Sequence, residues 1–160
     1  MSIFMPQLSP TDIIVRHAFP LEAGRIQQLY GLLVSNPDVQ VRPEDIAALS
    51  VDKAALFVCV ANSIVVATAL VCLCANVMFR TQPFAVVENV VVDPAWRGQG
   101  VGSKLFSFLE TFCRARDCSK IMLLSTSVRE DAHRFFAHVG YDSLAKRGFV
   151  KYRSQFSEIT

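Results

Sequence analysis

Apolar residues follow strand and helix patterns around one stretch in the second half of the chain. Valines at positions 86, 87, 90, 91 and 92 are typical of a strand over 85–92, which Asp93-Pro94 would end. Glycines follow at 98, 100 and 102. Apolar residues then recur every three or four positions and predict a helix to about Ala115, with one face made of Val101, Leu105, Phe108, Leu109, Phe112 and Cys113. The stretch therefore predicts a strand, a glycine loop and a helix.

Further elements are predicted on either side of this stretch. We expect strands at about 11–18, 55–61, 64–74 and 120–125, and helices from Pro20 to about Asn36 and from Pro43 to Leu49. Ser127 and Glu130 form a capping-box pattern before a last helix with Ala132, Phe135, Phe136 and Val139 on its apolar face, and Gly140 is placed to end it. Tyr141 and 148–152 suggest two short final strands. The order predicts a mixed α/β fold.

One long apolar segment raises the question of a membrane span. No charged residue occurs from Ala54 to Phe79, a run long enough to cross a bilayer. Asn62-Ser63 interrupts the run with a turn signal, and β-branched and aromatic residues dominate on both sides. This pattern favours two strands of a hairpin in a soluble α/β core.

Composition limits the class of protein. The chain has 160 residues, of which 52% are hydrophobic and 19% charged, as expected for a single globular domain over 1–160. A formal charge of +2 argues against a nucleic-acid-binding surface, and the N-terminus lacks a secretory signal pattern. The five cysteines contain no Cys-x-x-Cys pair and are interpreted as reduced thiols of a cytoplasmic protein. The three histidines lack ligand spacing, so no metal site is expected.

The glycine loop has the chemistry of an anion site. The first turn of a helix leaves backbone N–H groups without intrahelical partners, and glycine lets an anion approach them closely. A dinucleotide fingerprint would need glycine at 103, where Ser103 stands, and a P-loop would need Gly-Lys-Ser/Thr, whereas Gly102-Ser103-Lys104 has the wrong order. The alternative is that the glycines only make a tight connection.

The spacing of Arg97-Gly98-Gln99-Gly100-Val101-Gly102 resembles the Arg/Gln-x-x-Gly-x-Gly/Ala signature of the GNAT superfamily of N-acetyltransferases. A second stretch, Ala132-x-x-Phe135-Phe136-x-x-x-Gly140-Tyr141, is similar to the family's Ala-x-x-Phe-Tyr-x-x-x-Gly-Phe. The resemblance implies the GNAT fold, a mixed and mostly antiparallel sheet with splayed central strands flanked by helices. It also implies an N-acetyltransferase that moves the acetyl group of acetyl-CoA to a primary amine by direct attack on the thioester.

The resemblance also assigns residues to the cofactor. It places the pantetheine arm on Val90, Val91 and Val92, and the pyrophosphate on Arg97 and on the backbone amides of Gly98, Gln99, Gly100, Val101, Gly102 and Ser103. Ser103 could equally be an ordinary first-turn residue. Arg129 stands where many relatives have a cofactor-contacting asparagine, and Phe136 stands where they have a tyrosine that protonates the departing thiolate.

Glu88 is the candidate general base. An amine with a pKa of about 10 is mostly protonated at neutral pH, so a group must accept its proton before attack. Glu88 is the only carboxylate inside an apolar strand, and period-two alternation would put it on one face with Val90 and Val92. The alternatives are a salt bridge or solvation at the strand end. Asp93, before Pro94, is interpreted as a turn former.

Two other classes of function stay open at the sequence level. Phe136 in place of the family tyrosine allows a non-catalytic acyl-CoA-binding sensor, and the fold could also serve as an interaction module. The acceptor is left open among a small amine or antibiotic, a polyamine, an amino acid and a protein or peptide amine. No nucleic-acid or membrane partner is expected, and a homodimer is left open.

Overall fold

The computed structural model describes residues 13–157. The chain divides into two compact units, one that ends at Leu123 and one that begins at Leu124. Each unit is described by itself below. The larger unit contains the sheet, the glycine loop and three helices, whereas the smaller contains one α-helix and the C-terminal segment.

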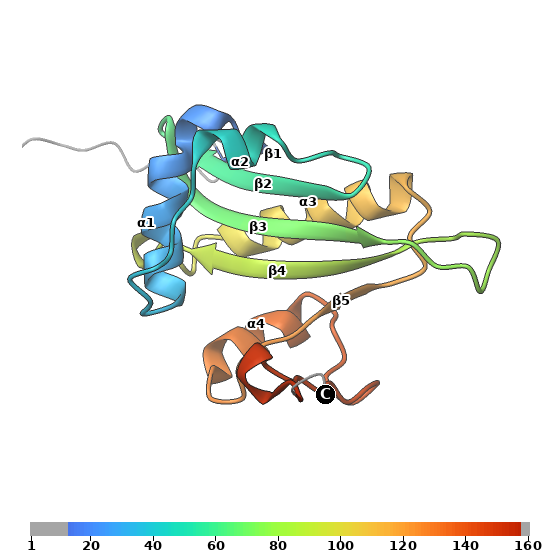
Figure 1. Ribbon diagram of the computed structural model, residues 1–160. Helices are drawn as coiled ribbons and strands as arrows, with labels where there is room; N and C mark the ends of the chain where they lie inside the picture. Colours follow the sequence, from blue (N-terminus) through green and yellow to red (C-terminus); the bar gives the residue numbers. More distant parts are fainter. Residues whose placement is uncertain (1–12, 158–160) are drawn as a thin grey trace, which may run out of the picture. The chain divides into compact units, whose positions relative to one another are not determined.

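The sheet of the larger unit has its strands in chain order (Figure 1). They are β1 (Ile14–His17), β2 (Ala54–Ala61), β3 (Ile64–Cys74), β4 (Phe84–Val92) and β5 (Ile121–Leu123). Neighbours from β1 to β4 pair antiparallel, and β5 pairs parallel to β4. This confirms the predicted mixed, mostly antiparallel sheet. Residues 11 and 12 of the predicted first strand lie outside the described residues.

The uncharged segment from Ala54 folds as the predicted hairpin. Asn62 and Ser63 connect β2 to β3 with φ angles of 52° and 61°. Two consecutive positive φ angles characterise the type I′ turn, whose twist matches that of the flanking strands. No helix among the described residues is long and apolar enough to cross a membrane.

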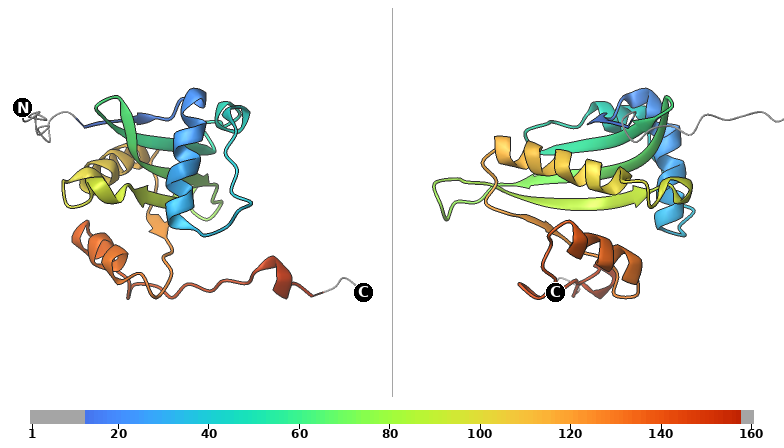
Figure 2. Two further views of the ribbon diagram at one scale, coloured as in Figure 1. Left: turned by 90° about the vertical axis from the view of Figure 1, so that its left-hand side faces the viewer. Right: turned by 180° about the vertical axis from the view of Figure 1, so that it is seen from behind.

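Helices cover both faces of this sheet (Figure 2). On one face α1 (Ala23–Leu33) and α2 (Pro43–Ala47) pack through Ile26, Leu29 and Ile46 against Leu56, Val58, Val65 and Val91. On the other face lies α3 (Val101–Ala115), whose Phe108 and Phe112 rings lie 5.2 and 4.9 Å from that of Phe57. A fully buried side chain such as Phe57, Ile26 or Leu29 contributes about 1.5–3 kcal/mol to stability. These two faces are called the α1 face and the α3 face below.

The α-helix predicted to begin at Pro20 begins three residues later, at Ala23. Residues Pro20–Glu22 form a 3-10 turn, and α1 begins at Ala23. Leu21, which lies on this 3-10 turn, is 85% exposed. The Arg16 guanidinium pairs with Glu22 at 2.7 Å and anchors this turn to β1.

The capping box predicted for the last helix is wrong. In the smaller unit α4 (Glu130–His138) has Arg129 at its N-cap, without a side-chain capping hydrogen bond. The Arg129 amide instead donates to the Thr126 carbonyl at 3.0 Å, so Ser127 lies in a turn before the helix. Glu130 faces Arg134 at 3.9 Å, one helical turn away.

The predicted end of this helix is confirmed. Gly140 has φ +95°, and the Gly140 and Tyr141 amides donate to the carbonyls of Ala137 and Phe136 at 3.1 and 2.9 Å. This is the hydrogen-bond pattern of a Schellman motif, which needs a residue in the left-handed region and usually adds an apolar contact. The Phe136 and Tyr141 rings, with centroids 6.3 Å apart, supply that contact.

The two short strands predicted after α4 do not form. Residues 142–157 contain no strand, only a 3-10 turn at Arg153–Gln155. Leu144, Phe149 and Val150 are 92, 88 and 58% exposed. β-Propensity alone did not suffice, because a strand is stable only when a neighbour pairs with its backbone.

Candidate functional site

The glycine loop leads directly from β4 into α3. Asp93 follows the last residue of β4 and caps a 3-10 turn at Pro94–Trp96, where its Oδ1 accepts a hydrogen bond from the Ala95 amide at 2.9 Å. Gly98 and Gly100 then have φ angles of 72° and 79°, in the left-handed region that glycine adopts readily. Gly100 is the N-cap of α3. The path of the chain thus favours glycine at both positions.

The start of α3 is suited to an anion. Its N-cap has no side-chain hydrogen bond, and the first-turn amides of Val101, Gly102 and Ser103 have no carbonyl one turn earlier in the helix. A Cβ placed on Gly98 or Gly100 would meet no heavy atom within 4 Å, so the space beside these backbones is open. Together with the positive end of the helix dipole, this geometry fits a pyrophosphate group.

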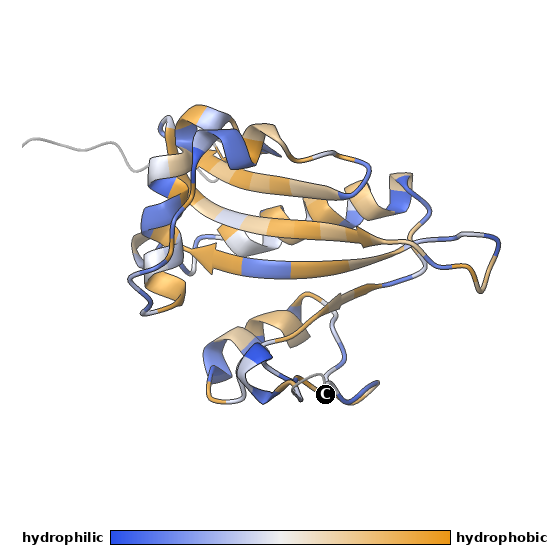
Figure 3. Cartoon of the chain, in the orientation of Figure 1, coloured by the Kyte–Doolittle hydropathy of each residue, from blue (hydrophilic) through white to orange (hydrophobic). Residues whose placement is uncertain are grey.

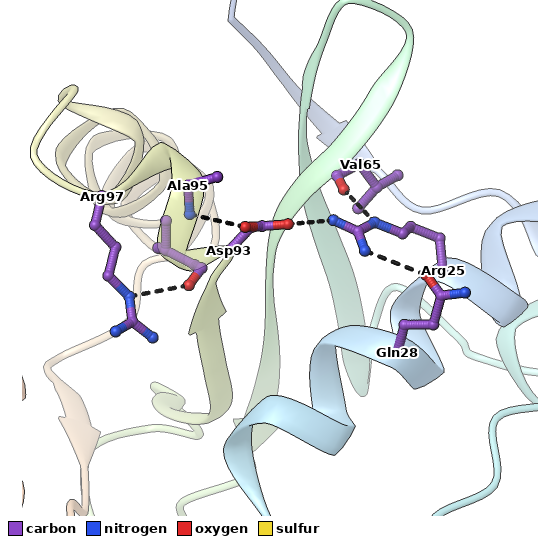
Figure 4. A network of polar contacts seen from close by, with 7 residues as sticks. Arg25, Gln28, Val65, Asp93, Ala95 and Arg97 are labelled. Carbon is purple, nitrogen blue, oxygen red and sulfur yellow. Dashed lines mark hydrogen bonds and ion pairs between the residues drawn. The ribbon is translucent and has the colours of Figure 1, made fainter.

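Two side chains of the loop fold back onto its backbone. The Nε of Arg97 donates to the Val92 carbonyl at 3.2 Å (Figure 4). Gln99 donates from Nε2 to the Ala95 carbonyl at 2.9 Å. Arg97 remains exposed, so its guanidinium is held beside the loop with charge available to a ligand. Gln99 is better placed to offer its backbone amide than its side chain.

Asp93 has a second role besides turn formation. Its Oδ2 lies 2.5 Å from Nη2 of Arg25 on α1, and Arg25 also donates from Nε to the Val65 carbonyl at 2.9 Å (Figure 4). The Ala95 amide and the Arg25 guanidinium hold the pKa of the Asp93 carboxyl below its ordinary value. The sequence offered no signal for this pair, which joins α1 to the beginning of the glycine loop.

One edge of β4 lacks a strand partner near the loop. Its pairing with β5 covers Ala85, Val86 and Val87 only, and no described strand pairs with that edge further along. The Asp93 amide donates to the Val66 carbonyl of β3 at 2.8 Å, so by alternation the N–H and C=O of Val92 point the other way, toward the free edge. The backbone of Val90 points there too. Only three residue pairs join β4 to β5, and the open edge beyond them agrees with the splayed central strands that the resemblance implies.

Val91 differs from its two neighbours. Its Cα partner is Thr68 on β3, and its side chain is 4% exposed within the cluster that packs against α1. Its backbone is directed toward β3 rather than the free edge. A cofactor contact is therefore better supported for Val90 and Val92 than for Val91.

A β-bulge at Asn89 interrupts the alternation of β4. Leu70 pairs with Glu88 and Thr68 with Val91, so one residue of β3 faces both Asn89 and Val90. Asn89 has φ +55°, which asparagine tolerates better than most residues. Glu88 consequently shares the α1 face with Val91. The prediction that it shares a face with Val90 and Val92 is wrong, because the extra residue shifts the alternation by one.

Tyr30 holds this bulge from α1. Its phenol is hydrogen-bonded to the side chains of Asn89 and Thr68, and Thr68 Oγ1 donates to the Phe57 carbonyl at 2.8 Å. Since Thr68 uses its only proton on Phe57, Tyr30 donates to Thr68 and accepts from Asn89. Burial raises the pKa of Tyr30, so it stays protonated at neutral pH. Neither Tyr30 nor Asn89 was predicted as a site residue, although an asparagine within a run of valines is typical of a bulge.

Glu88 is exposed on the α1 face. Within residues 13–157 it forms no salt bridge, which removes the ion-pair alternative for that range. Its carboxylate is near enough to the Cys72 thiol to help raise the pKa of that thiol, after burial and Cys74. The middle of β4 is accordingly the one hydrophilic stretch of an otherwise apolar strand (Figure 3).

The remaining predicted site residues lie on different elements. Ser103 is exposed on the first turn of α3. Arg129 and Phe136 belong to the smaller unit, where Arg129 is exposed and Phe136 packs against the rings of Phe135 and Tyr141, at 5.5 and 6.3 Å. The larger unit alone thus brings together Glu88, the free edge of β4 and the glycine loop.

Comparison with known proteins decides the family. Residues 26–141 match the Acetyltransferase (GNAT) family. The chain belongs to this family. The match includes the glycine loop and extends across the boundary between the two units. Among the described residues, no group of three or more His, Cys, Asp or Glu side chains could hold a metal ion.

Individual GNAT proteins resemble the chain over different lengths. An aminoalkylphosphonate N-acetyltransferase from Salmonella typhimurium is 36% identical over 55 residues, which are 34% of this chain and 36% of that relative. A structure described as an acetyltransferase from Agrobacterium tumefaciens has a TM-score of 0.78 at 27% identity, with 88% of this chain and 99% of that chain covered. Glucosamine-6-phosphate N-acetyltransferase from Arabidopsis thaliana has a TM-score of 0.71 at 21% identity, with 88% and 98% covered, and shows the fold alone.

Proposed function

We propose that this chain transfers the acetyl group of acetyl-CoA to a primary amine by direct attack of the amine on the thioester. The observation that carries the proposal is the continuity of the free β4 edge with the glycine turn of α3. An extended arm with amide groups and a pyrophosphate at its end matches those two features in order. Acetyl-CoA, when bound, supplies an activated acetyl group.

The residues of the larger unit have distinct roles in this proposal. The outward backbone groups of Val90 and Val92 bind the pantetheine arm as a neighbouring strand would. The amides from Gly98 to Ser103 hold the pyrophosphate, and the guanidinium of Arg97 adds a charge-assisted contact. Because Arg97 is already held by the Val92 carbonyl, little of its mobility is lost on binding.

Glu88 accepts the proton of the incoming amine. Its exposed carboxylate lies on β4 two residues before Val90, at the bulge that ends the regular pairing. A carboxylate without an ion-pair partner in the described chain is available to bind an ammonium group and then to take its proton, directly or through one water. Tyr30 fixes Asn89 and so positions Glu88 relative to the edge.

A second candidate function follows from Phe136. Phenylalanine cannot donate a proton to a departing thiolate, so the family tyrosine has no equivalent at this position. With a cysteine-like thiol pKa of about 8.5, a thiolate leaves tolerably near neutral pH, and water or the attacking nitrogen can supply the proton. We therefore favour an enzyme without a side-chain general acid here over a non-catalytic acyl-CoA sensor.

Other features of the proposal concern the whole protein. We treat residues 1–160 as one domain, since the family match crosses the boundary between the units. The five cysteines are free thiols, which supports a reducing compartment such as the cytoplasm.

Thiol release from acetyl-CoA with a panel of amines tests the function. If the protein is an enzyme, release of the CoA thiol should depend on the amine, and the mass of the amine should increase by one acetyl group. Binding is measured separately: acetyl-CoA at about 100 times its dissociation constant should stabilise the protein by about 2.7 kcal/mol. Stabilisation without turnover of any amine would favour the sensor. If acetyl-CoA neither stabilises the protein nor is consumed, an interaction module would be favoured.

The variant Phe136→Tyr should keep wild-type stability, because the two rings are nearly isosteric. Activity in this variant together with an inactive wild type would contradict the proposal of an active wild-type enzyme.

A further inference from the structure

Three neighbouring strands present partly exposed apolar side chains beside Glu88. We call this set the apolar floor; it consists of Leu70, Cys72, Cys74, Phe84, Val86 and Met122. The register pairs Leu70 with Glu88, Cys72 with Val86, Cys74 with Phe84, and Val86 with Met122. Cross-strand partners point to the same face of a sheet, so the floor and the Glu88 side chain share the α1 face.

On the opposite face of the sheet, the side chains of the same strands are buried. Val71, Ala85 and Val87 alternate with the floor residues and are 0, 0 and 1% exposed. On the α1 face, the buried cluster around Ile26 and Leu29 includes Leu70 at its border but none of the other floor residues. The helices of the larger unit therefore cover this end of the α3 face and leave the floor accessible. An apolar surface of this kind next to a reactive group is characteristic of a ligand site.

Two charged groups border the floor at opposite ends. Glu88 stands at one end, where it pairs with Leu70. At the other end the Lys120 ammonium lies 5.1 Å from the centroid of the Phe84 ring. Phe84 and Glu88 are four residues apart on β4, which corresponds to about 13 Å. A short amine with a phosphate or phosphonate group cannot place its nitrogen at Glu88 and its anion at Lys120. Closer to Glu88 the anion would meet apolar side chains and the carboxylate itself.

We propose that the acceptor is a primary amine carried on an apolar body, such as an arylalkylamine. This inference rests on the proposed acetyltransferase function and names the substrate class of the same site. The ammonium group is held at Glu88, and the apolar body lies on the floor. Val86 is two residues from Glu88, about 7 Å along the strand, so a ring separated from the nitrogen by two methylene groups would cover Val86 and Cys72.

A matched pair of amines tests the proposal. 2-Phenylethylamine and 2-aminoethylphosphonate carry the same two-carbon spacer and differ in whether the far end is apolar or anionic. For wild type we expect kcat/KM to be about 100-fold higher for 2-phenylethylamine, in line with the discrimination that an apolar pocket achieves. Equal values, or a preference for the phosphonate, would overturn the proposal.

Variants that introduce a charge test whether the apolar floor causes the preference for 2-phenylethylamine. Val86→Arg should lower kcat/KM for 2-phenylethylamine at least about 10-fold and narrow the ratio between the two amines. If Val86→Arg does not fold, Met122→Lys replaces it, because the flexible lysine chain is easier to accommodate. It should also lower kcat/KM for 2-phenylethylamine and narrow the ratio between the two amines. Leu21→Arg is the matched control, since Leu21 is 85% exposed and lies on the 3-10 turn before α1. An unchanged ratio in both floor variants would contradict the proposed location.

The outcomes separate this proposal from the general function. Turnover of other amines without turnover of 2-phenylethylamine would contradict the substrate class and leave the acetyltransferase function standing. Absence of turnover with every amine, combined with no stabilisation by acetyl-CoA, would contradict both.

Discussion

Arg25 on α1 and Asp93 at the end of β4 form an ion pair with a 2.5 Å contact between Nη2 and Oδ2. Both side chains are partly buried, and Arg25 is fixed further by the Val65 carbonyl. The pair connects the helix that covers one face of the sheet to the first residue of the glycine loop. It therefore couples the packing of α1 to the position of the proposed pyrophosphate site.

The Asp93 carboxyl makes stability depend on pH. Its pKa in the folded protein is lowered below the ordinary 3.8 by the Ala95 amide and by Arg25. A lowered pKa contributes stability that is fully present above the unfolded value and is lost as pH falls through the folded value. The difference in unfolding free energy between wild type and Asp93→Asn, measured by urea denaturation, should be larger at pH 7 than at pH 3. A difference that does not change between these pH values would contradict the assignment.

Gly100 tests the anion site at the start of α3. Gly100→Asp places a negative charge beside the first-turn amides and should nearly abolish acetyl-CoA binding, measured by calorimetry. Gly100→Ala is the matched control: its Cβ meets no atom within 4 Å, so it carries only the left-handed backbone cost of about 1–2 kcal/mol. Similar affinities of Gly100→Asp and Gly100→Ala would show that charge at this position is irrelevant.

The Asn89 bulge should matter for catalysis more than for cofactor affinity. Asn89→Val cannot adopt φ +55° without strain and would favour regular alternation, which turns Glu88 away from the α1 face. We expect kcat to fall at least about 10-fold with a small change in the Kd of acetyl-CoA. Asn89→Gly keeps the backbone angle and should retain more activity than Asn89→Val. The reverse order of the two variants would argue against the bulge.

Much of the larger unit could be predicted because its signals are local. The type I′ turn at Asn62-Ser63, the apolar period of α3 and the glycine loop all follow from residues close in sequence. The face of the sheet to which Glu88 points could not be predicted, because it depends on how β4 pairs with β3 around Asn89. The Arg25–Asp93 pair joins residues 68 positions apart and leaves no pattern in the sequence.

The errors in the smaller unit have a similar cause. Ser127 and Glu130 have the spacing of a capping box, but the turn closed by Thr126 and Arg129 delays the helix. Residues 148–152 have the composition of a strand but no pairing partner within the described chain. Both predictions used local propensity where a nonlocal or competing hydrogen bond decided the outcome.

The central claim is that Glu88 takes a proton from an amine that attacks acetyl-CoA. The most direct measurement is kcat for N-acetyl product formation by wild type and Glu88→Gln between pH 6 and 9, with saturating acetyl-CoA. Glu110→Gln, an exposed carboxylate on α3, is the control. We predict that Glu88→Gln lowers kcat by about 10²–10⁴-fold, leaves the Kd of acetyl-CoA nearly unchanged and flattens the acid limb of the pH profile, while Glu110→Gln behaves as wild type. No acetylated amine from wild type, or equal kcat for wild type and Glu88→Gln across this range, would contradict the claim.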